Sequence, residues 1–434
     1  MRAFVEHRLG LLVLVVAALT GLYGLAYATR PAAPQTHPVA GPRKVPVASV
    51  TAVCPGGKGE QVDVYLPGTL SHEDLADEPY VTSGPAGLEA GYLTRATAGA
   101  ARGLAGVRCT EPAAATWLVG PGPANADLRL HLTNADKAPA QVDVLVYAAE
   151  GMVSGDQGIG LEVAPGTHRE IDLKTLAPAA DVMAVSVTTV FGRVAVAART
   201  TLESGGVDWL PAAAPPATRV VVPGIPGGGG RRELLVAAPG QADAVVRVKA
   251  VGEDAEYAMR GRESLDVPAG GVVSLDVTTG LGASSAALEL TSSVPIVAGV
   301  VITGTGRHPD VAFTAGTASL ELGSAVAGNL PGSRLVLTAL GGPGKVRVQL
   351  VPDEGAAEPA FEVSVPAGRT RSVPLKGKGE FAVVVSPVSG KVYGGRVVEE
   401  NQKTGLLITA QPLAPARMWT LLPPLDDSPR VVLP

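Results

Sequence analysis

A strand–turn–strand pattern that occurs three times in this 434-residue chain constrains its fold more than any other feature. In Phe361–Leu375, apolar and polar residues alternate on both sides of a Pro-Ala-Gly turn, and related segments occupy Leu161–Leu173 and Leu265–Val277. Alternation with a period of two is typical of strands buried on one face, and a Pro/Gly pair between two such runs predicts a hairpin. The turn prolines are separated by 103 and 98 residues, which indicates a diverged, domain-sized repeat: Pro165, Pro268 and Pro366.

The composition favours an all-β fold. Apolar residues make up 46% of the chain but aromatic residues only 4%, so the cores must consist mainly of Val, Leu and Ala. The 54 glycines and 37 prolines disfavour long helices and suit short strands joined by turns. A repeat of about 100 residues matches a β-sandwich, whereas propeller blades repeat at about 40–50 residues. We therefore predict tandem, immunoglobulin-like β-sandwiches.

Residues 1–28 have the features of an export segment. Arg2 and Arg8 precede an uncharged apolar run of 20 residues at 9–28, which is long enough to cross a bilayer. Two interpretations stay open. The length of the run favours an uncleaved membrane anchor, and the A-x-A motif at Ala26–Ala28 favours a cleaved signal peptide. Both predict a protein outside the cytoplasm, either anchored to the cell membrane by this segment or secreted.

The rest of the chain divides into a linker and four β segments. Five prolines in residues 29–46 predict an extended spacer. Residues 47–123 follow as an N-terminal β segment that contains both cysteines. The three β-sandwich repeats are expected at 124–226, 231–331 and 332–434.

Two polar segments are interpreted as loops. The acidic segment Ser71–Pro79 lacks the spacing of an EF-hand and is expected to be a solvated loop or helical turn. The glycine run at 226–230 is followed by Arg231 and a strand, whereas a phosphate-binding loop ends in a GK[ST] motif and precedes a helix. We interpret this run as a flexible linker between repeats.

The only two cysteines, Cys54 and Cys109, lie in the first β segment. An even number of cysteines in an exported chain favours a disulfide, and closing a loop of this length stabilises by about 4 kcal/mol. A structural zinc site would need four ligands at tight spacing, and a redox-active pair is usually close in sequence. We therefore predict a structural disulfide between these two residues.

The three tryptophans stand near the limits of the predicted repeats, each one or two residues before a leucine and shortly before a proline: Trp117, Trp209 and Trp419. One interpretation makes them platforms on which sugars stack. The other makes them core anchors at the seams where one repeat meets the next. Their placement at about one repeat length favours the structural seam.

Several of these features together resemble a known family. These features are VCPGG at Cys54, Cys109 ahead of Trp117, and DWLPAA followed by VVVPGIPGG. They are similar to an exported actinobacterial cell-envelope family, catalogued as a domain of unknown function, with β-sandwich repeats and tryptophan seams. The likeness extends from about Cys54 to the C-terminus. It implies a fold and an envelope location, and it carries no site residues with it.

The sequence predicts no catalytic, cofactor-binding or metal-binding residues. No G-x-S-x-G motif is present, and the carboxylate pairs Asp353-Glu354 and Asp426-Asp427 fall on turns. The histidines are isolated, so a metal site would need distant residues to converge: His7, His37, His72, His131, His168 and His308. With a net charge of −5 and scattered Lys and Arg, the chain also offers no basic patch for nucleic acid.

Three hypotheses about function follow. The first is a non-catalytic exported cell-envelope protein that acts as a scaffold or as an interaction surface for other envelope proteins. The second is an array of glycan-binding modules for cell-wall polysaccharide, which the aromatic content of 4% disfavours. The third is an exported hydrolase, which the missing catalytic motifs disfavour. The first is our prediction.

Overall fold

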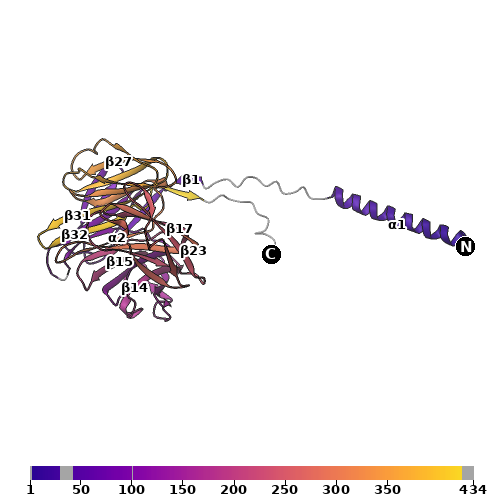
Figure 1. The fold of residues 1–434 in the computed structure, drawn as a ribbon, viewed down its shortest axis with the longest axis horizontal. Coiled ribbons are helices and arrows are strands. Elements are labelled where there is room, and N and C mark those ends of the chain that lie inside the picture. Colours follow the sequence, from indigo (N-terminus) through magenta and orange to yellow (C-terminus); the bar gives the residue numbers. More distant parts are fainter. Residues whose placement is uncertain (1, 30–42, 100, 423–434) are drawn as a thin grey trace. The chain divides into compact units, whose positions relative to one another are not determined.

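The computed structural model describes residues 2–29, 43–99 and 101–422, and residues 46–420 form one compact unit (Figure 1). Helix α1 spans Arg2–Ala28. No helix in these described ranges qualifies as long and apolar enough to cross a membrane, so the predicted anchor at 9–28 gains no support. Residues 30–42 of the predicted linker and the pair Asp426-Asp427 lie outside the described residues. Strands β1 (Arg43–Pro46) and β33 (Trp419–Leu422) pair with each other.

Three successive β-sandwiches share one order of eight main strand segments. The first, sixth, third and fourth segments form one sheet, and the fifth, second, seventh and eighth form the facing sheet. Sandwich 1 consists of β8 (Ala115–Pro121), β9 (Ala126–Thr133), β10 (Ala140–Ala148), β12 (Leu161–Val163), β13 (His168–Asp172), β14 (Val182–Phe191), β15 (Ala195–Leu202) and β16 (Val207–Leu210). Sandwich 2 consists of β17 (Ala217–Ile225), β18 (Arg232–Ala237), β19 (Ala244–Val251), β21 (Ser264–Val267), β22 (Val272–Asp276), β23 (Ala286–Thr303) and β24 (Val311–Ala315). Sandwich 3 consists of β25 (Ser324–Asn329), β26 (Arg334–Ala339), β27 (Gly344–Pro352), β28 (Phe361–Val365), β29 (Arg369–Pro374), β30 (Phe381–Ser389), β31 (Val392–Gln402) and β32 (Gly405–Pro412).

Smaller elements complete these sandwiches. Strand β23 is long enough to serve as both the sixth and the seventh segment of sandwich 2, since its first half pairs with β17 and β19 and its second half with β18 and β24. The short elements are β11 (Gly151–Met152), η1 (Leu173–Thr175), β20 (Glu256–Ala258), α2 (Thr278–Leu281) and η2 (Leu320–Leu322). Each predicted repeat range begins after the first strand of the sandwich that it names, because the turn pattern marks the middle of a sandwich and not its edge.

The predicted alternation of buried and exposed residues is confirmed in the strands. In β19, Ala244, Val246 and Val248 are buried, and the intervening Val245 and Arg247 are exposed. The sheets pack with these buried sides facing each other, and the cores are built from Val, Leu and Ala with few aromatic rings. This confirms the all-β prediction and the aliphatic cores.

The predicted connectivity is wrong in two respects. In an immunoglobulin sandwich the first strand pairs with the second, whereas here the first pairs with the sixth and the seventh pairs with the second. The Pro/Gly turns are also not hairpins. Strand β28 pairs with β27, and β29 pairs with β26 in the facing sheet, so the turn at Pro366 passes from one sheet to the other. Alternation shows which side chains are buried but does not select the partner strand.

The N-terminal segment is a shortened copy of the same sandwich, here called the N-terminal sandwich. Its strands are β2 (Ser49–Cys54), β3 (Gln61–Leu66), β4 (Thr69–Asp74), β5 (Tyr80–Pro85), β6 (Glu89–Ala96) and β7 (Gly103–Arg108). Strand β2 pairs with β5, and β4-β3-β6-β7 forms the facing sheet, which matches the complete copies without their third and fourth strands. The predicted acidic loop therefore contains part of a strand, β4, which pairs with β3.

The glycine run at 226–230 is not a linker between repeats. It joins β17 to β18 within sandwich 2. The buried guanidinium of Arg232 donates to the carbonyls of Pro226 at 3.0 Å and Gly228 at 2.7 Å, and it fastens the loop to the sandwich. Glycine suits the loop because Gly230 has φ +102°, and a Cβ there would lie 2.0 Å from the carbonyl oxygen of Thr303.

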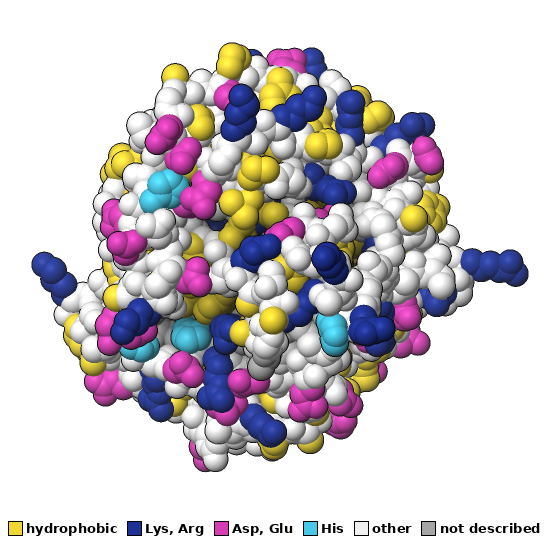
Figure 2. Space-filling view, turned by 90° about the vertical axis from the view of Figure 1, so that its left-hand side faces the viewer, with side chains coloured by type: hydrophobic (Ala, Val, Ile, Leu, Met, Phe, Trp, Pro, Cys, Tyr) yellow, Lys and Arg dark blue, Asp and Glu magenta, His cyan; other side chains and the backbone are white. Residues whose placement is uncertain are grey.

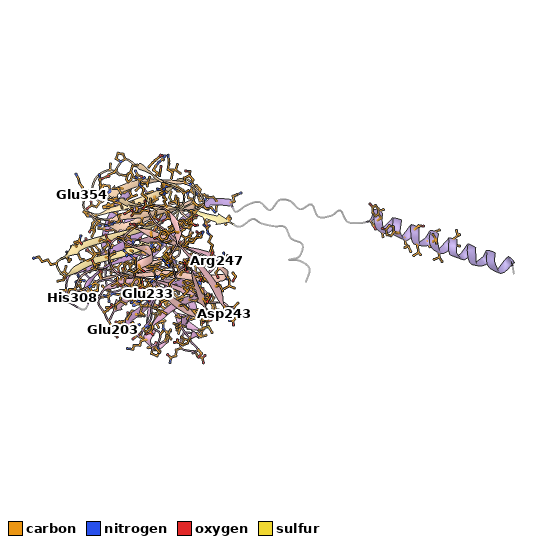
Figure 3. The ribbon with its side chains drawn as sticks, viewed as in Figure 1. Glu203, Glu233, Asp243, Arg247, His308 and Glu354 are labelled. Atoms are coloured by element: carbon orange, nitrogen blue, oxygen red, sulfur yellow. A yellow bond between two sulfur atoms is a disulfide. The ribbon has the colours of Figure 1, made fainter. Side chains whose placement is uncertain are left out.

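The four sandwiches form a closed ring in chain order. Their last strands are the inner strands of this ring: β7 contacts β16 and β32, and β24 contacts the same two strands. Viewed as in Figure 2, this body has a rounded outline on which acidic, basic and apolar side chains are intermixed. Figure 3 likewise shows Glu203 and Glu354 well separated from each other and from the neighbouring pair Asp243 and Arg247. Charge is therefore distributed and forms no basic face in these views.

Among the described residues, three of the four inner strands also contribute to the core of the preceding sandwich. Trp209 of β16 packs with Val50, Leu88 and Val107 in the N-terminal sandwich. Phe313 of β24 packs in the core of sandwich 1, and Ile408 of β32 packs in the core of sandwich 2. The N-terminal sandwich, sandwich 1 and sandwich 2 therefore each complete their core with side chains of the next sandwich, whereas the core of sandwich 3 consists of its own residues.

Candidate functional site

The ring is organised around a buried carboxylate at the start of the inner strands. Asp310 directly precedes β24 and is fully buried. Its side chain accepts hydrogen bonds from the backbone N–H groups of Leu104 at 2.8 Å, Val207 at 3.3 Å, Val311 at 2.9 Å and Ile408 at 2.9 Å. These donors belong to β7, β16, β24 and β32, so one side chain binds all four inner strands. Burial raises the pKa of Asp310 to about 6, although the four N–H groups oppose the shift.

A second carboxylate lies further along the inner strands. Asp208 of β16 is fully buried and accepts hydrogen bonds from the N–H groups of Gly106 and Trp209 and from the Thr409 hydroxyl at 3.0 Å. Burial raises the pKa of Asp208 well above its ordinary value. Arg396 is buried nearby and donates to Gln411 at 2.9 Å, and burial lowers its pKa to about 10. This group of side chains fills the space between the strands.

Glycine allows the inner strands to approach closely. A Cβ on Gly103 would lie 2.7 Å from the Asp310 carboxylate, and a Cβ on Gly106 would lie 2.7 Å from the Thr409 hydroxyl. Both carboxylates are enclosed and engaged with main-chain or hydroxyl donors. These hydrogen bonds connect the inner strands and hold the ring together.

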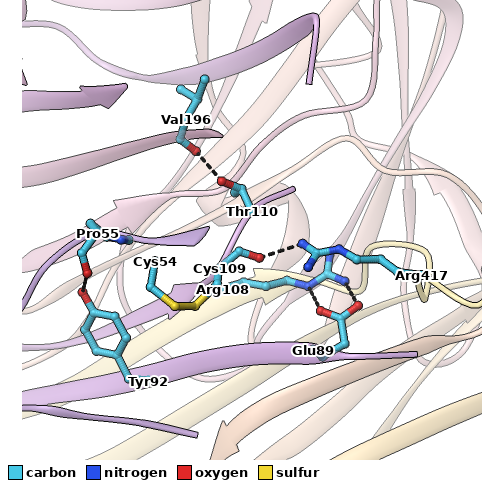
Figure 4. Close-up of a disulfide and its surroundings, with 9 residues drawn as sticks. All are labelled: Cys54, Pro55, Glu89, Tyr92, Arg108, Cys109, Thr110, Val196 and Arg417. Atoms are coloured by element: carbon cyan, nitrogen blue, oxygen red, sulfur yellow. Dashed lines mark hydrogen bonds and ion pairs between the residues drawn. A yellow bond between two sulfur atoms is a disulfide. The ribbon is translucent and has the colours of Figure 1, made fainter. Parts of the chain in front are cut away.

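A cavity of about 260 Å³ opens at the other end of the inner strands. The residues that line it include Cys109, Trp209, Pro211, Gln411, Pro412 and Arg417. Cys109 is bonded to Cys54, which confirms the predicted disulfide (Figure 4). The disulfide is fully buried in the core of the N-terminal sandwich, which identifies it as structural.

Charged side chains surround this disulfide (Figure 4). The Arg108 guanidinium forms two hydrogen bonds with the buried Glu89 carboxylate, at 3.1 and 2.6 Å. Arg417 donates to the carbonyl oxygen of Cys109 at 2.7 Å and lies 3.9 Å from Glu111. The segment after β32 is thereby fastened to the end of β7, where the ring closes.

A lateral cleft of about 360 Å³ lies between the N-terminal sandwich and sandwich 1. Basic and aromatic side chains contribute to its lining: Lys58, Tyr92, Arg95, His131, Arg199 and Trp209. The rings of His131 and Trp209 are 5.5 Å apart, and burial lowers the pKa of His131, which favours the neutral imidazole at pH 7. Arg95 is paired with Glu400 at 2.6 Å. The cleft combines hydrogen-bond donors with an aromatic wall.

The three predicted seam tryptophans occupy different environments. Trp209 is 8% exposed and lies in the core of the N-terminal sandwich. Trp117 of β8 is partly buried against Tyr147 and against apolar residues of sandwich 2. Trp419 lies on β33 and is 38% exposed. The interpretation of all three as seams stays a prediction.

A group of metal-ligating side chains was not predicted from the sequence. Asp63 on β3, His72 on β4 and Glu380, directly before β30, each place one ligand atom within 4.8 Å of the others. His72 is near Asp63 in sequence, but Glu380 lies about 300 residues away, on sandwich 3. The spacing of the histidines in the sequence therefore could not predict that these three side chains lie together. Their proximity depends on the closure of the ring.

Comparison with known proteins identifies the family. A family model described as a family of unknown function, DUF5719, matches residues 76–376. The protein belongs to this family. The match confirms the predicted relation to a family of unknown function, and it shows neither an actinobacterial origin nor the tryptophan seams. No curated protein matches the chain.

Solved structures offer only weak similarity. Thermotoga maritima 1070 is 18% identical, with a TM-score of 0.20, over 23% of this chain and 93% of that protein. An anti-sigma factor domain-containing protein from Clostridium clariflavum is 10% identical, with a TM-score of 0.13, over 85% of this chain and 98% of that one. The α-L-rhamnosidase of Streptomyces avermitilis is 12% identical, with a TM-score of 0.13, over 88% of this chain and 56% of the enzyme. At these scores the similarities carry no argument about fold or function.

Proposed function

We propose that the protein is a non-catalytic component of the cell envelope that acts as a scaffold or as an interaction surface for other envelope proteins. The observation that carries this proposal is the ring itself, in which Asp310 binds all four inner strands and three of these strands, β16, β24 and β32, enter the core of the preceding sandwich. Such interlocking suits a rigid body that holds surfaces at set distances. Its two fully buried acids, Asp208 and Asp310, accept hydrogen bonds from main-chain N–H groups and from a hydroxyl group.

We further propose an extracytoplasmic location. A buried disulfide supports it, because disulfides persist mainly in oxidising compartments. Two basic residues, Arg2 and Arg8, ahead of an apolar run also fit an export segment, either cleaved or retained. Alkylation of free thiols in intact cells, followed by fractionation, tests the location. An oxidised protein outside the cytoplasm supports the proposal, and a reduced cytoplasmic protein contradicts it.

Exposed apolar side chains offer a surface for partners. In sandwich 1, Val190 and Phe191 at the end of β14 are 66% and 51% exposed. Val388 lies at the corresponding end of β30 in sandwich 3 and is 46% exposed. Exposed apolar groups of this kind are enriched where proteins bind one another. We infer that these connections between the sixth and seventh strands, which cross from one sheet to the other, contact envelope proteins.

Site-specific cross-linking in living cells tests this function. A photoreactive group at position 191 should capture a defined envelope protein, whereas the same group at Arg247, an exposed polar position on sandwich 2, should not. Substitution of Val190 and Phe191 by serine should remove the partner without changing the Tm. Hydrolysis of an envelope substrate that is lost on replacement of one Asp, Glu or Ser would contradict the proposal.

The lateral cleft favours a second candidate function, binding of cell-wall polysaccharide. Its basic side chains and its aromatic wall suit a hydroxyl-rich or acidic sugar. Substitution of Arg199 by alanine separates the two functions. Loss of polysaccharide binding with retained protein cross-links would assign the cleft to glycan, and unchanged binding would exclude it from that role.

A further inference from the structure

We propose that Asp63, His72 and Glu380 bind a divalent transition-metal ion, best fitted by Zn²⁺, where the N-terminal sandwich meets sandwich 3. Two of these residues lie on adjacent strands of the first sandwich, and the third lies at the start of β30 in the last. The site goes beyond the proposed scaffold function, since it assigns a ligand and a means of fastening the closed ring.

The distances between the side chains fit a shared ion. The Nδ1 atom of His72 lies 3.4 Å from Oε2 of Glu380 and 2.7 Å from Oδ1 of Asp63. In a tetrahedral zinc site with bonds of about 2.0–2.2 Å, two ligand atoms lie about 3.3–3.5 Å apart. The first pair already has that separation. The second pair needs to open by about 0.6 Å, which a small side-chain rotation provides.

A fourth residue is positioned to orient the imidazole. Nε2 of His72 lies 3.9 Å from Oδ2 of Asp353. The other oxygen of that carboxylate accepts a hydrogen bond from the N–H of Glu354 at 2.8 Å, which holds the carboxylate in place. Histidines that bind a metal through one nitrogen usually direct the other N–H to a carboxylate or carbonyl. Asp353 is therefore placed as a positioning residue rather than a ligand, and its carboxylate must approach Nε2 by about 1 Å to accept a hydrogen bond.

The charge of the cluster also calls for a cation. Asp63, Glu380 and Asp353 converge on one imidazole, and every ion pair that the described residues give these three carboxylates runs to His72. Asp63 is almost fully buried, with its side chain 7% exposed, whereas Glu380 is 46% exposed. A divalent ion would neutralise the buried carboxylate, and the exposed glutamate leaves a path for the ion to enter. The imidazole nitrogen favours zinc-like ions over Ca²⁺ and Mg²⁺, which prefer oxygen ligands.

The supporting structure holds the site in place. Asp63 and His72 pair directly across β3 and β4. The backbone N–H of Asp353 donates to the carbonyl of Glu380 at 3.3 Å, and the main chain of Gly328 in β25 bonds to Asp63. Ligands on such paired segments need little rearrangement to bind an ion. A bound ion would link residues of the first and last sandwiches and add to the closure of the ring.

Titration of the full chain with Zn²⁺ by calorimetry tests the site. We expect one ion per chain. Glu380→Gln and His72→Ala should each weaken binding by at least about 100-fold, and Asp353→Asn by about 10-fold, within the range known for orienting partners of metal ligands. His168→Ala is the matched control, because His168 also lies beside a carboxylate, Glu78, at 3.1 Å. It should bind Zn²⁺ as the unmodified protein does.

Several outcomes would overturn the site. These are an absence of Zn²⁺ binding, binding that Glu380→Gln leaves unchanged, an equal loss in His168→Ala, or tighter binding of Ca²⁺ than of Zn²⁺. Because Glu380 is half-exposed, Glu380→Gln keeps the test valid even where His72→Ala does not fold. The Tm offers a second readout: Zn²⁺ should raise it in the unmodified protein and leave it unchanged in Glu380→Gln. An equal rise in both proteins would also contradict the proposal.

Discussion

The N-terminal sandwich and sandwich 3 show two ways to stabilise one strand order. Sandwich 3 has all eight strands and a continuous aliphatic core, with Phe381 as a fully buried aromatic ring. The N-terminal sandwich lacks the third and fourth strands, and its core contains the Cys54–Cys109 disulfide and the Trp209 ring of its neighbour. Small domains with little core are commonly stabilised by disulfides or by association. The shortened copy uses both, so it depends on the ring more than the complete copies do.

The largest effect is expected from removing the borrowed aromatic ring. Trp209→Ala should destabilise by about 5 kcal/mol, at the upper end for a buried aromatic residue, because the shortened core has little else to fill the space. Phe313→Ala removes the equivalent contribution to the complete sandwich 1 and should cost about 3 kcal/mol. Urea unfolding of both variants measures the difference. Equal losses would remove the distinction between the shortened and the complete sandwich.

Loss of the disulfide should come next. Replacement of Cys54 and Cys109 by serine should destabilise by about 4 kcal/mol, since the bond closes a long loop of the unfolded chain. Limited proteolysis should then cleave the N-terminal sandwich before sandwich 3. As a control, free thiols are counted in the unmodified protein after denaturation without reduction. Two free thiols there would show that the disulfide is absent.

Removal of the central carboxylate should cost about 3 kcal/mol. In Asp310→Asn one oxygen becomes an NH₂ donor, which leaves backbone N–H groups of the inner strands without an acceptor, at about 1–3 kcal/mol for each buried group. Asn has nearly the same size as Asp. The variant therefore tests the negative charge and the hydrogen-bond acceptors of the side chain, and it does not change the packing volume. Unchanged stability in chemical denaturation would show that the carboxylate does not hold the strands together.

The same residue predicts a pH dependence. The pKa of Asp310 rises from its ordinary value near 4 to about 6 on folding, so the folded state binds more protons than the unfolded state between these values. The free energy of unfolding should therefore fall as pH rises from about 4 to about 6, and this contribution becomes constant above pH 6. The pKa of Asp63 is also raised to about 6, so Asp310→Asn should remove only part of the slope. An unchanged slope in the variant would contradict the assignment.

The smallest changes in stability are expected from replacing glycines by alanine. Their size should depend on whether other atoms lie close to the added methyl group. Gly103→Ala would place a methyl group 2.7 Å from both Asp310 and Val207, and overpacking of this kind costs about 1–3 kcal/mol. Gly240→Ala is the control, because nothing lies within 4 Å of a Cβ there, and its Tm should stay the same or rise slightly. A Tm for Gly103→Ala that matches this control would show that the inner strands are further apart than described.

Much of the strand content could be predicted from the sequence, because alternation directly reflects burial on one face. The disulfide could also be predicted, because Cys54 and Cys109 had no other partner. Strand pairing could not be predicted. The turn at Pro366 has the same local pattern whether it joins two paired strands or crosses between sheets, and only the packing of the whole sandwich decides.

Two acidic residues in the sequence weakly indicate the centre of the ring, although the sequence analysis did not single them out. Asp208 and Asp310 stand about one repeat apart, each directly before apolar residues of a last strand. An acid at such a position is costly to bury unless it binds several donors. The His72 group offered no comparable signal, since its third member, Glu380, becomes a neighbour only when the last sandwich meets the first.

Hydrogen exchange at the inner strands tests the closed ring most directly. The amides of Leu104, Val207, Val311 and Ile408 all donate to Asp310. We predict that these four amides are among the slowest to exchange and that Asp310→Asn accelerates all four together. Four different exchange rates, with acceleration confined to Val311 on the strand that Asp310 precedes, would show independent sandwiches and contradict the ring.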